Sequence, residues 1–295
     1  MIQVLANGLV DGAILALVAI SLTIIFSILR VPHFGLGGVL VWGAFVAYFG
    51  VTRFGLNLGI AALAAALGMA LFGVVIEKLA FSRLRGATED AMFVSAIGVL
   101  LALENGALLL WGSEGRSIPV PGALQGVVTI PGIVYLPSMR ILIFVVTAAA
   151  FIGLQLYVTR TRMGRAMRAV AQDPVAARLL GVPIDRVASW SFAFGSGMAG
   201  LGGALVGATF TMSFDMGSPI ILKAFVVVVL GGLGSVGGAI VGGLLLGVVD
   251  SLTLTYVTSQ FKQLVAFSLL ILVLVLRPAG LFGQRVLRAD VQATR

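Results

Sequence analysis

The sequence lacks the residues on which disulfides and most metal sites depend. It contains no cysteine and a single histidine, His33. The absence of cysteine excludes disulfides and thiolate metal sites, and one histidine cannot supply a zinc site built on histidines. We therefore expect neither a metal site nor a cofactor. The sequence also shows no nucleophile paired with a base, which disfavours a membrane enzyme.

Charged residues are scarce as well. They make up 10% of the 295 residues, whereas a typical soluble domain carries roughly 25%. Hydrophobic residues make up 60% of the chain, and its mean hydropathy is +1.14. A chain this apolar cannot cover its surface with polar groups in water, but it can fold where lipid covers that surface. Because no polar stretch is long enough to bury a separate core, we expect one transmembrane domain over residues 1–295.

Apolar runs recur along the whole chain, and most approach the 20 or so residues that a helix needs to cross a bilayer. Lipid offers no partners for backbone N–H and C=O groups, so these runs should be helices. We predict an all-α integral membrane protein with eight transmembrane helices. The runs lie at residues 12–29, 34–52, 54–76, 91–111, 141–159, 187–214, 224–249 and 260–276. The segment Met1–Gly8 lacks the basic residues of a cleavable signal peptide, so the first run is expected to remain as a span.

Lysine and arginine predict the orientation, because basic residues concentrate in cytoplasmic loops. With the N-terminus outside, far more basic residues face inward than outward before the sixth helix. The inward set is Arg30, Lys78, Arg83, Arg85 and arginines 160, 162, 165, 168, 178 and 186, and the outward set is Arg53, Arg116 and Arg140. The C-terminal tail, which carries Arg277, Arg285, Arg288 and Arg295, is then also expected inside.

A cytoplasmic tail requires an even number of crossings after residue 186, whereas the apolar runs supply three. The sequence suggests that a break in the glycine-rich middle of residues 219–249 resolves this mismatch. The break would give a short extra crossing or a re-entrant half-helix. Ser218 and Pro219 are expected to cap and begin this helix. Its N-terminus could face an anionic substrate group or be an ordinary capped end. Irregular backbone at membrane depth should be buried or line a pathway.

The connection at residues 160–186 is the most basic segment. Residues 162–171 are predicted to form a short basic helix. Asp173 is expected to cap a second short helix that has Pro174 at its first position, and Gly181 is expected to end it. A helix this short is marginal alone, so we expect it to dock on another protein. The alternative is a solvated loop that only fixes topology.

Two further stretches are informative. The proline-rich residues 112–138 predict an extracytoplasmic loop without a long helix, with a possible strand at residues 126–130. The stretch Gly232–Gly237 matches G-x-G-x-x-G, but a dinucleotide site would need a preceding strand and a βαβ unit. No G-x-x-x-x-G-K-[ST] motif is present, so the chain should not hydrolyse ATP itself. Small residues four apart instead predict close helix packing: Gly238 with Gly242, Gly243 with Gly247, and Gly195 with Ala199, Gly203 and Gly207.

Ionisable residues inside membrane spans are costly and are functional candidates by default. The sequence places Asp11, Glu104, Lys223 and Asp250 in or near spans. For each, an equally good interpretation is a satisfied bond between helices. His33, beside Pro32, is expected to be a satisfied interfacial histidine. The candidates for the translocation pathway are Asn7, Glu104, Asn105, Ser218 and Asp250.

Over nearly its whole length the chain resembles the Liv-type permease subunits of branched-chain amino-acid ABC importers. The matching stretches are Asn7-Gly8 with Gly12, residues 95–98 leading to Glu104-Asn105, residues 162–166 through 179–181, residues 229–235 with Gly238-Ala239, and residues 276–283. The resemblance implies a half-pore in the bacterial inner membrane. It would pair with a second homologous permease, bind two ATP-binding subunits inside and receive substrate from a periplasmic binding protein outside.

By this resemblance the short helix in residues 160–186 is the coupling helix. The residues implied in ATPase coupling are Arg165, Asp173, Pro174, Ala177, Arg178 and Gly181. Family members commonly read Asn-Phe-Ala-His-Gly-Glu after the first helix, whereas this chain reads His-Phe-Gly-Leu-Gly-Gly at residues 33–38. The substrate could therefore be a branched-chain or other amino acid, urea, an amide, an aromatic acid or a dicarboxylate. A self-contained secondary transporter or channel is the remaining alternative.

Overall fold

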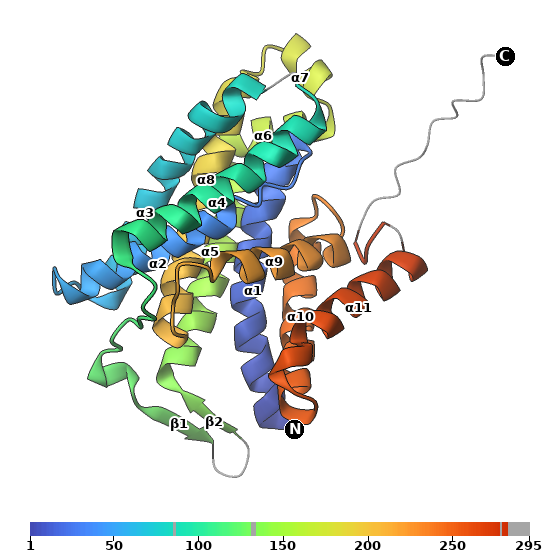
Figure 1. Cartoon of the computed structure of the whole chain (residues 1–295). Helices are drawn as coiled ribbons and strands as arrows, with labels where there is room; N and C mark the ends of the chain where they lie inside the picture. The colour runs from blue at the N-terminus through green and yellow to red at the C-terminus, as the bar shows by residue number, and fades with distance from the viewer. Residues whose placement is uncertain (85–86, 131–133, 278, 283–295) are drawn as a thin grey trace.

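The computed structural model describes residues 1–84, 87–130, 134–277 and 279–282, most of which are helical (Figure 1). Within these residues there are eleven α-helices: α1 Ile2–Leu29, α2 Leu36–Thr52, α3 Leu58–Ile76, α4 Glu89–Trp111, α5 Ser138–Arg160, α6 Arg162–Gln172, α7 Pro174–Leu179, α8 Ile184–Thr209, α9 Gly217–Gly231, α10 Val236–Tyr256 and α11 Lys262–Leu276. Strands β1 Val127–Ile130 and β2 Val134–Pro137 form an antiparallel hairpin with Val127 opposite Pro137.

The protein is an all-helical membrane protein. Seven helices of the described chain, with α3 counted through its extension to Leu84, are long and apolar enough to cross a membrane, and α2 and α9 are shorter apolar helices. The predicted all-helical membrane architecture is therefore confirmed, but the predicted number of eight spans is not. Several residues used in the sequence argument lie outside the described residues: Arg85, Pro131, Pro278, Gly283, Arg285, Arg288 and Arg295.

The first helix begins earlier than its uncharged run suggests. α1 starts at Ile2 and not near residue 12, so Asn7 and Asp11 lie within the helix. The polar residues do not stop the helix, because the helix backbone satisfies its own hydrogen bonds and leaves only the side chains to be accommodated.

Close backbone contacts at glycines join the helices at the centre of the molecule. α10 runs antiparallel to α1, with Gly247 beside Gly12 and Gly243 beside Ala16. A Cβ added to Gly247 would lie 2.2 Å from the Cα of Gly12, so a larger residue cannot occupy this position without moving a backbone. Gly195 and Gly203 of α8 make similar close contacts with α1 and α2. The predicted close packing of small residues is confirmed.

The break predicted in residues 219–249 is present between α9 and α10. Gly232 and Gly234 adopt positive φ angles of 102° and 85°, which favour glycine. Ser235 then caps α10, and its hydroxyl accepts a hydrogen bond from the N–H of Gly238 at 3.0 Å. Figure 1 shows α9 lying across α1 and not alongside it. The C-terminal segment pairs with the end of α9, where the N–H of Leu281 donates to the carbonyl of Leu230 at 2.8 Å. Leu233 and Gly234 of the break are exposed, so the protein does not cover the irregular backbone as predicted.

The start of α9 differs from the prediction. The helix begins at Gly217, Met216 is its N-cap and makes no side-chain cap bond, and Ser218 is the second helical residue. Ser218 does not cap the helix because a side chain from another helix, described below, takes that role.

The molecule has two distinct ends (Figure 1). At the N-terminal end of α1, Gln3 donates from Nε2 to the carbonyl of Tyr135 in the hairpin at 2.8 Å. At the other end of α1, Ile28 packs against a small apolar cluster that includes Met167 and Val170 of α6. The hairpin and the basic segment 160–186 therefore lie at opposite ends of α1, as the predicted topology requires.

Candidate functional site

The basic connection folds as two short helices, as the sequence predicts. Thr161 caps α6, and its hydroxyl accepts from the N–H of Gly164 at 3.0 Å. Asp173 caps α7 by accepting from the N–H groups of Val175 and Ala176 at 2.8 and 3.0 Å. These caps satisfy N–H groups that a short helix would otherwise leave to water. The connection is therefore an ordered structure and not merely a solvated loop.

Glycines stand at the turn into α6 and directly after the end of α7. A Cβ on Gly164 would lie 2.4 Å from the carbonyl oxygen of Val158, so the turn from α5 into α6 has no room for one. Gly181 has φ of 79°, and no atom lies within 4 Å of a Cβ placed there. The constraint at Gly181 is thus purely conformational, as expected for the residue that ends a helix.

α7 presents an apolar surface outside the spans. Val175, Leu179 and Leu180 are 69%, 84% and 84% exposed, and none of these three was among the residues predicted for ATPase coupling. Around them the arginines of the segment, including Arg165 and Arg178, are exposed. Ala177, in contrast, is buried and holds α7 against the rest of the chain. A capped helix that exposes leucines between arginines has the character of a protein docking surface.

The Glu104 carboxylate lies at the N-terminus of α9. Its Oε1 accepts from the backbone N–H of Ser218 at 2.8 Å, and both carboxylate oxygens accept from the Ser218 hydroxyl at 2.9 Å. Glu104 is only 7% exposed although it lies midway along α4. A negative group is stabilised there by the unpaired N–H groups and the dipole of the helix. The structure thus joins two of the predicted pathway residues into one contact.

An apolar pocket of about 200 Å³ adjoins this contact. Aromatic and aliphatic side chains form most of its wall, and Ser218 contributes one edge. The lining residues are Phe34, Phe93, Ile97, Leu100, Ser218, Ile221 and Leu222.

Asn7 and Asn105 are not brought into this site. Asn105 is exposed and donates from Nδ2 to the carbonyl of Leu101 in its own helix at 2.8 Å, so it points away from its neighbour Glu104. Asn7 accepts from Gln3 at 3.2 Å near the N-terminal end of α1.

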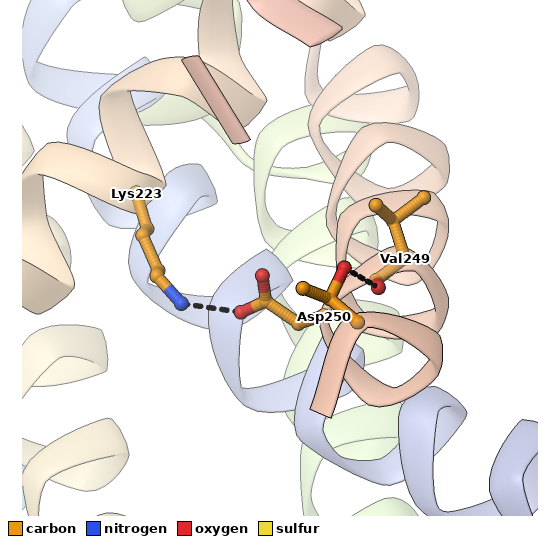
Figure 2. Close-up of polar contacts among 4 residues, drawn as sticks. Lys223, Val249 and Asp250 are labelled. Carbon is orange, nitrogen blue, oxygen red and sulfur yellow. Dashed lines mark hydrogen bonds and ion pairs between the residues drawn. The ribbon is translucent and has the colours of Figure 1, made fainter. Parts of the chain in front are cut away.

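Lys223 and Asp250 form an ion pair between α9 and α10. Figure 2 shows the two side chains pointing toward one another, with Nζ of Lys223 on Oδ2 of Asp250. Asp250 is 8% exposed. Asp11 of α1 adjoins Gly12, whose backbone contacts Gly247 on the helix that carries Asp250. Its charge interacts with those of Lys223 and Asp250, and also with those of Arg140 and Lys262. The sequence named Asp11, Lys223 and Asp250 as separate candidates, and the fold gathers them into one cluster.

Two buried titratable residues follow the ends of α1 and α3. His33 is packed against Phe81 and Phe192, with ring centroids 4.7 and 5.1 Å away, and burial lowers the pKa of His33 to about 3. Glu77, which the sequence argument overlooked, is 1% exposed in a π-helical turn that continues α3, and its Oε2 accepts from Ser189 at 2.8 Å. Both ring nitrogens of His33 are buried without a hydrogen-bond partner among the described residues, so the prediction of a satisfied histidine is wrong.

Comparison with known proteins gives a consistent picture. A family described as branched-chain amino acid transport system / permease component matches residues 4–274. The high-affinity branched-chain amino acid transport system permease protein BraD of Pseudomonas aeruginosa is 37% identical over 96% of each chain. LivH of Escherichia coli K12 is 33% identical over 96% of each chain, and LivM of the same strain is 28% identical over 94% of this chain and 70% of its own.

The chain is also similar to a solved structure, PsaBC from Streptococcus pneumoniae in complex with Fab. That match covers 90% of this chain and 89% of the other, with 12% identity and a TM-score of 0.49.

Proposed function

Because the chain belongs to the family of branched-chain amino acid transport permeases, we propose that it moves branched-chain amino acids inward through a half-pore driven by separate ATP-binding subunits. It is the permease component of an ABC transport system and is not itself catalytic. The alternative substrates are urea, amides, aromatic acids and dicarboxylates. The branched-chain assignment is favoured by the apolar pocket beside Ser218, because aliphatic and aromatic walls suit an aliphatic side chain.

The observation that carries the proposal is the surface of α7. Val175 and Leu179 of α7 and its C-cap residue Leu180 are exposed apolar residues outside the spans. A self-contained transporter or channel has no need of such a surface, whereas a permease must transmit motion from its ATPase. We propose that α7 is the coupling helix, with Arg165 and Arg178 making charged contacts and Asp173, Pro174, Ala177 and Gly181 holding its shape.

We infer the orientation in the membrane from the basic residues at one end of the molecule. Arg30 follows the end of α1 that packs against α6, and the arginines of the basic segment lie at this end too. Basic residues concentrate on the cytoplasmic side, so we propose that this end and the C-terminus are cytoplasmic and that the N-terminus and the hairpin are outside. The membrane would be the bacterial inner membrane.

A second permease chain of the same family is the proposed partner within the membrane. Escherichia coli K12 has two permease proteins similar to this chain, LivH and LivM. Two related permeases in one organism fit a pore built from two homologous halves. A periplasmic binding protein would deliver substrate to the outer end, where the hairpin lies.

Within the half-pore we propose that Asn7, Glu104, Asn105, Ser218 and Asp250 lie along or beside the pathway. Glu104 and Ser218 carry most of this proposal, because a buried carboxylate at the start of a broken helix is costly to keep for packing alone. The contact would also make the position of α9 sensitive to changes at α4.

The docking role can be tested by changing the exposed leucines of α7. Leu179→Asp combined with Leu180→Asp should weaken binding of the ATP-binding subunits by about tenfold or more, because charges replace exposed apolar contacts. The measurement is co-purification of the permease with the ATPase encoded beside it. Val127→Asp changes an exposed apolar residue at the opposite end and should leave the ATPase bound. Normal ATPase binding by the double variant would refute the docking surface.

A further inference from the structure

The ion pair of Lys223 with Asp250 leaves polar atoms unused. Asp250 Oδ1 and Asp11 Oδ1 are buried and have no hydrogen-bond partner within the part of the chain that is described. Arg140 Nη1 is buried and unpaired in the same sense. An ion pair that serves only to hold two helices together gains most when every remaining lone pair and proton is satisfied. The cluster thus contains two acceptor oxygens and one donor nitrogen that are buried without partners, which costs free energy.

The charged groups of the cluster lie on different helices. Asp11 and Asp250 lie on α1 and α10, whose backbones are in close contact at Gly12 and Gly247. Lys223 lies on α9, a short helix that is followed by glycines with positive φ. The two carboxylates are therefore on a closely packed helix pair, and the ammonium group is on a third helix.

The chemistry of the cluster matches one kind of ligand. Two buried carboxylate oxygens without partners suit a group with several N–H donors, and Lys223 already supplies an ammonium group to Asp250. The neighbouring cations, Lys223, Arg140 and Lys262, suit a carboxylate. A zwitterionic amino acid carries both groups on one carbon and adds one charge of each sign, so binding it does not change the net charge of the cluster.

We propose that Asp11, Lys223, Asp250 and Arg140 recognise the charged head of an α-amino acid during its passage. The substrate ammonium replaces Lys223 on Asp250 and Asp11, and the released Lys223 pairs with the substrate carboxylate together with Arg140. In the structure the ion pair of Lys223 with Asp250 occupies this place. This inference rests on the proposed function. It adds that the ammonium and carboxylate groups of the substrate bind at this cluster, separately from the substrate side chain.

Two double variants separate recognition from packing. Lys223→Met with Asp250→Leu replaces the pair by apolar residues, which usually preserves or raises stability. Lys223→Asp with Asp250→Lys restores an ion pair in reverse and so restores the bond between α9 and α10. Thr253→Val is the matched control on α10, because the Thr253 hydroxyl donates to the carbonyl of Val249 in its own helix at 2.8 Å.

Uptake of leucine, ATPase activity and melting temperature would be measured on the complete transporter in proteoliposomes. We expect both double variants to retain their ATPase subunits and to lose uptake by about tenfold or more, and we expect Thr253→Val to transport normally. Normal uptake by the apolar variant, or uptake restored by the reversed pair, would overturn the inference and leave the proposed function standing. Failure of the unchanged protein to show ATP-dependent uptake would instead refute the proposed function.

Discussion

At the scale of single residues, Glu104 has the most consequential position in the membrane. Its carboxylate occupies the start of α9 and bonds both the N–H and the hydroxyl of Ser218. Charge-assisted bonds of this kind contribute more than neutral ones, and the partner helix is the one that breaks at Gly232. A change at Glu104 is therefore expected to alter the position of α9 and not the assembly of the transporter.

Glu104→Leu should reduce uptake while leaving the ATP-binding subunits attached. The loss of a buried charge-assisted contact is worth about 1.5–3 kcal/mol, which corresponds to at least a tenfold effect on a step that depends on it. Uptake and ATPase co-purification are to be measured on the same preparation. Glu104→Gln keeps an acceptor for Ser218 and should show a smaller loss. Uptake unchanged in the leucine variant would remove Glu104 from the pathway.

His33 gives the protein a pH-dependent stability. Because burial lowers the pKa of His33 from 6.5 to about 3, the unfolded chain binds a proton in this range that the folded chain does not. The stabilising contribution is complete above pH 6.5 and falls as the pH is lowered toward 3. Between about pH 8 and about pH 5 the loss amounts to about 2 kcal/mol.

This prediction is checked by melting curves of the purified transporter at both pH values. His33→Leu removes the titrating group, so its melting temperature should fall less between the two conditions than that of the unchanged protein. An equal fall in both proteins would show that His33 does not carry the effect.

Single residues also show what sequence can predict. Asp11, Glu104, Lys223 and Asp250 could be identified because charges in apolar runs are rare. Their partners could not, since Glu104 and Ser218 are separated by 114 positions and meet only when α4 packs near α9. The exposed leucines of α7 were missed for the opposite reason: an apolar residue in an apolar protein gives no signal until its surroundings are known.

At the scale of elements, α7 combines capped ends with an exposed apolar surface. Asp173 fixes its start, and Gly181 ends it in a conformation that costs an L-residue roughly 1–2 kcal/mol. Caps and stops of this kind could be predicted because they depend on neighbouring residues alone. The start of α9 could not, because its capping group comes from another helix.

Gly181→Val should strain the end of α7 and uncouple ATP hydrolysis from uptake. The Cβ would meet no other atom, so the effect is due to backbone conformation and not to a clash. Asparagine tolerates positive φ better than most residues, and Gly181→Asn should therefore retain coupling. The ratio of substrate transported to ATP hydrolysed is the measurement. Equal ratios in the valine variant and the unchanged protein would argue against α7 as the coupling helix.

At the scale of the whole molecule, the break between α9 and α10 reconciles the apolar runs with the charge distribution. The sequence required an additional reversal of the chain after residue 186, and the glycines at 232 and 234 provide it. The number of spans was harder to predict, because α2 and α9 are short and α9 lies across its neighbours. Hydropathy records how apolar a segment is and not the direction in which it runs.

The proposed orientation can be tested directly because the chain contains no cysteine. Ala176→Cys in α7 and Ser113→Cys in the loop after α4 would each introduce a single thiol. In intact cells a membrane-impermeant maleimide should label Cys at 113 and not at 176, and permeabilised cells should allow both. The reverse pattern would invert the topology and place α7 out of reach of a cytoplasmic ATPase.

The central claim is that this chain is a half-pore that works only with ATP-binding partners. Its most direct test is uptake of labelled leucine into proteoliposomes that contain the chain, its second permease and its ATP-binding subunits, with the binding protein outside and ATP available to the ATPase. We expect uptake that requires ATP and every subunit, and that stops when the ATPase is replaced by a hydrolysis-deficient variant. Uptake by the chain alone without ATP would contradict it.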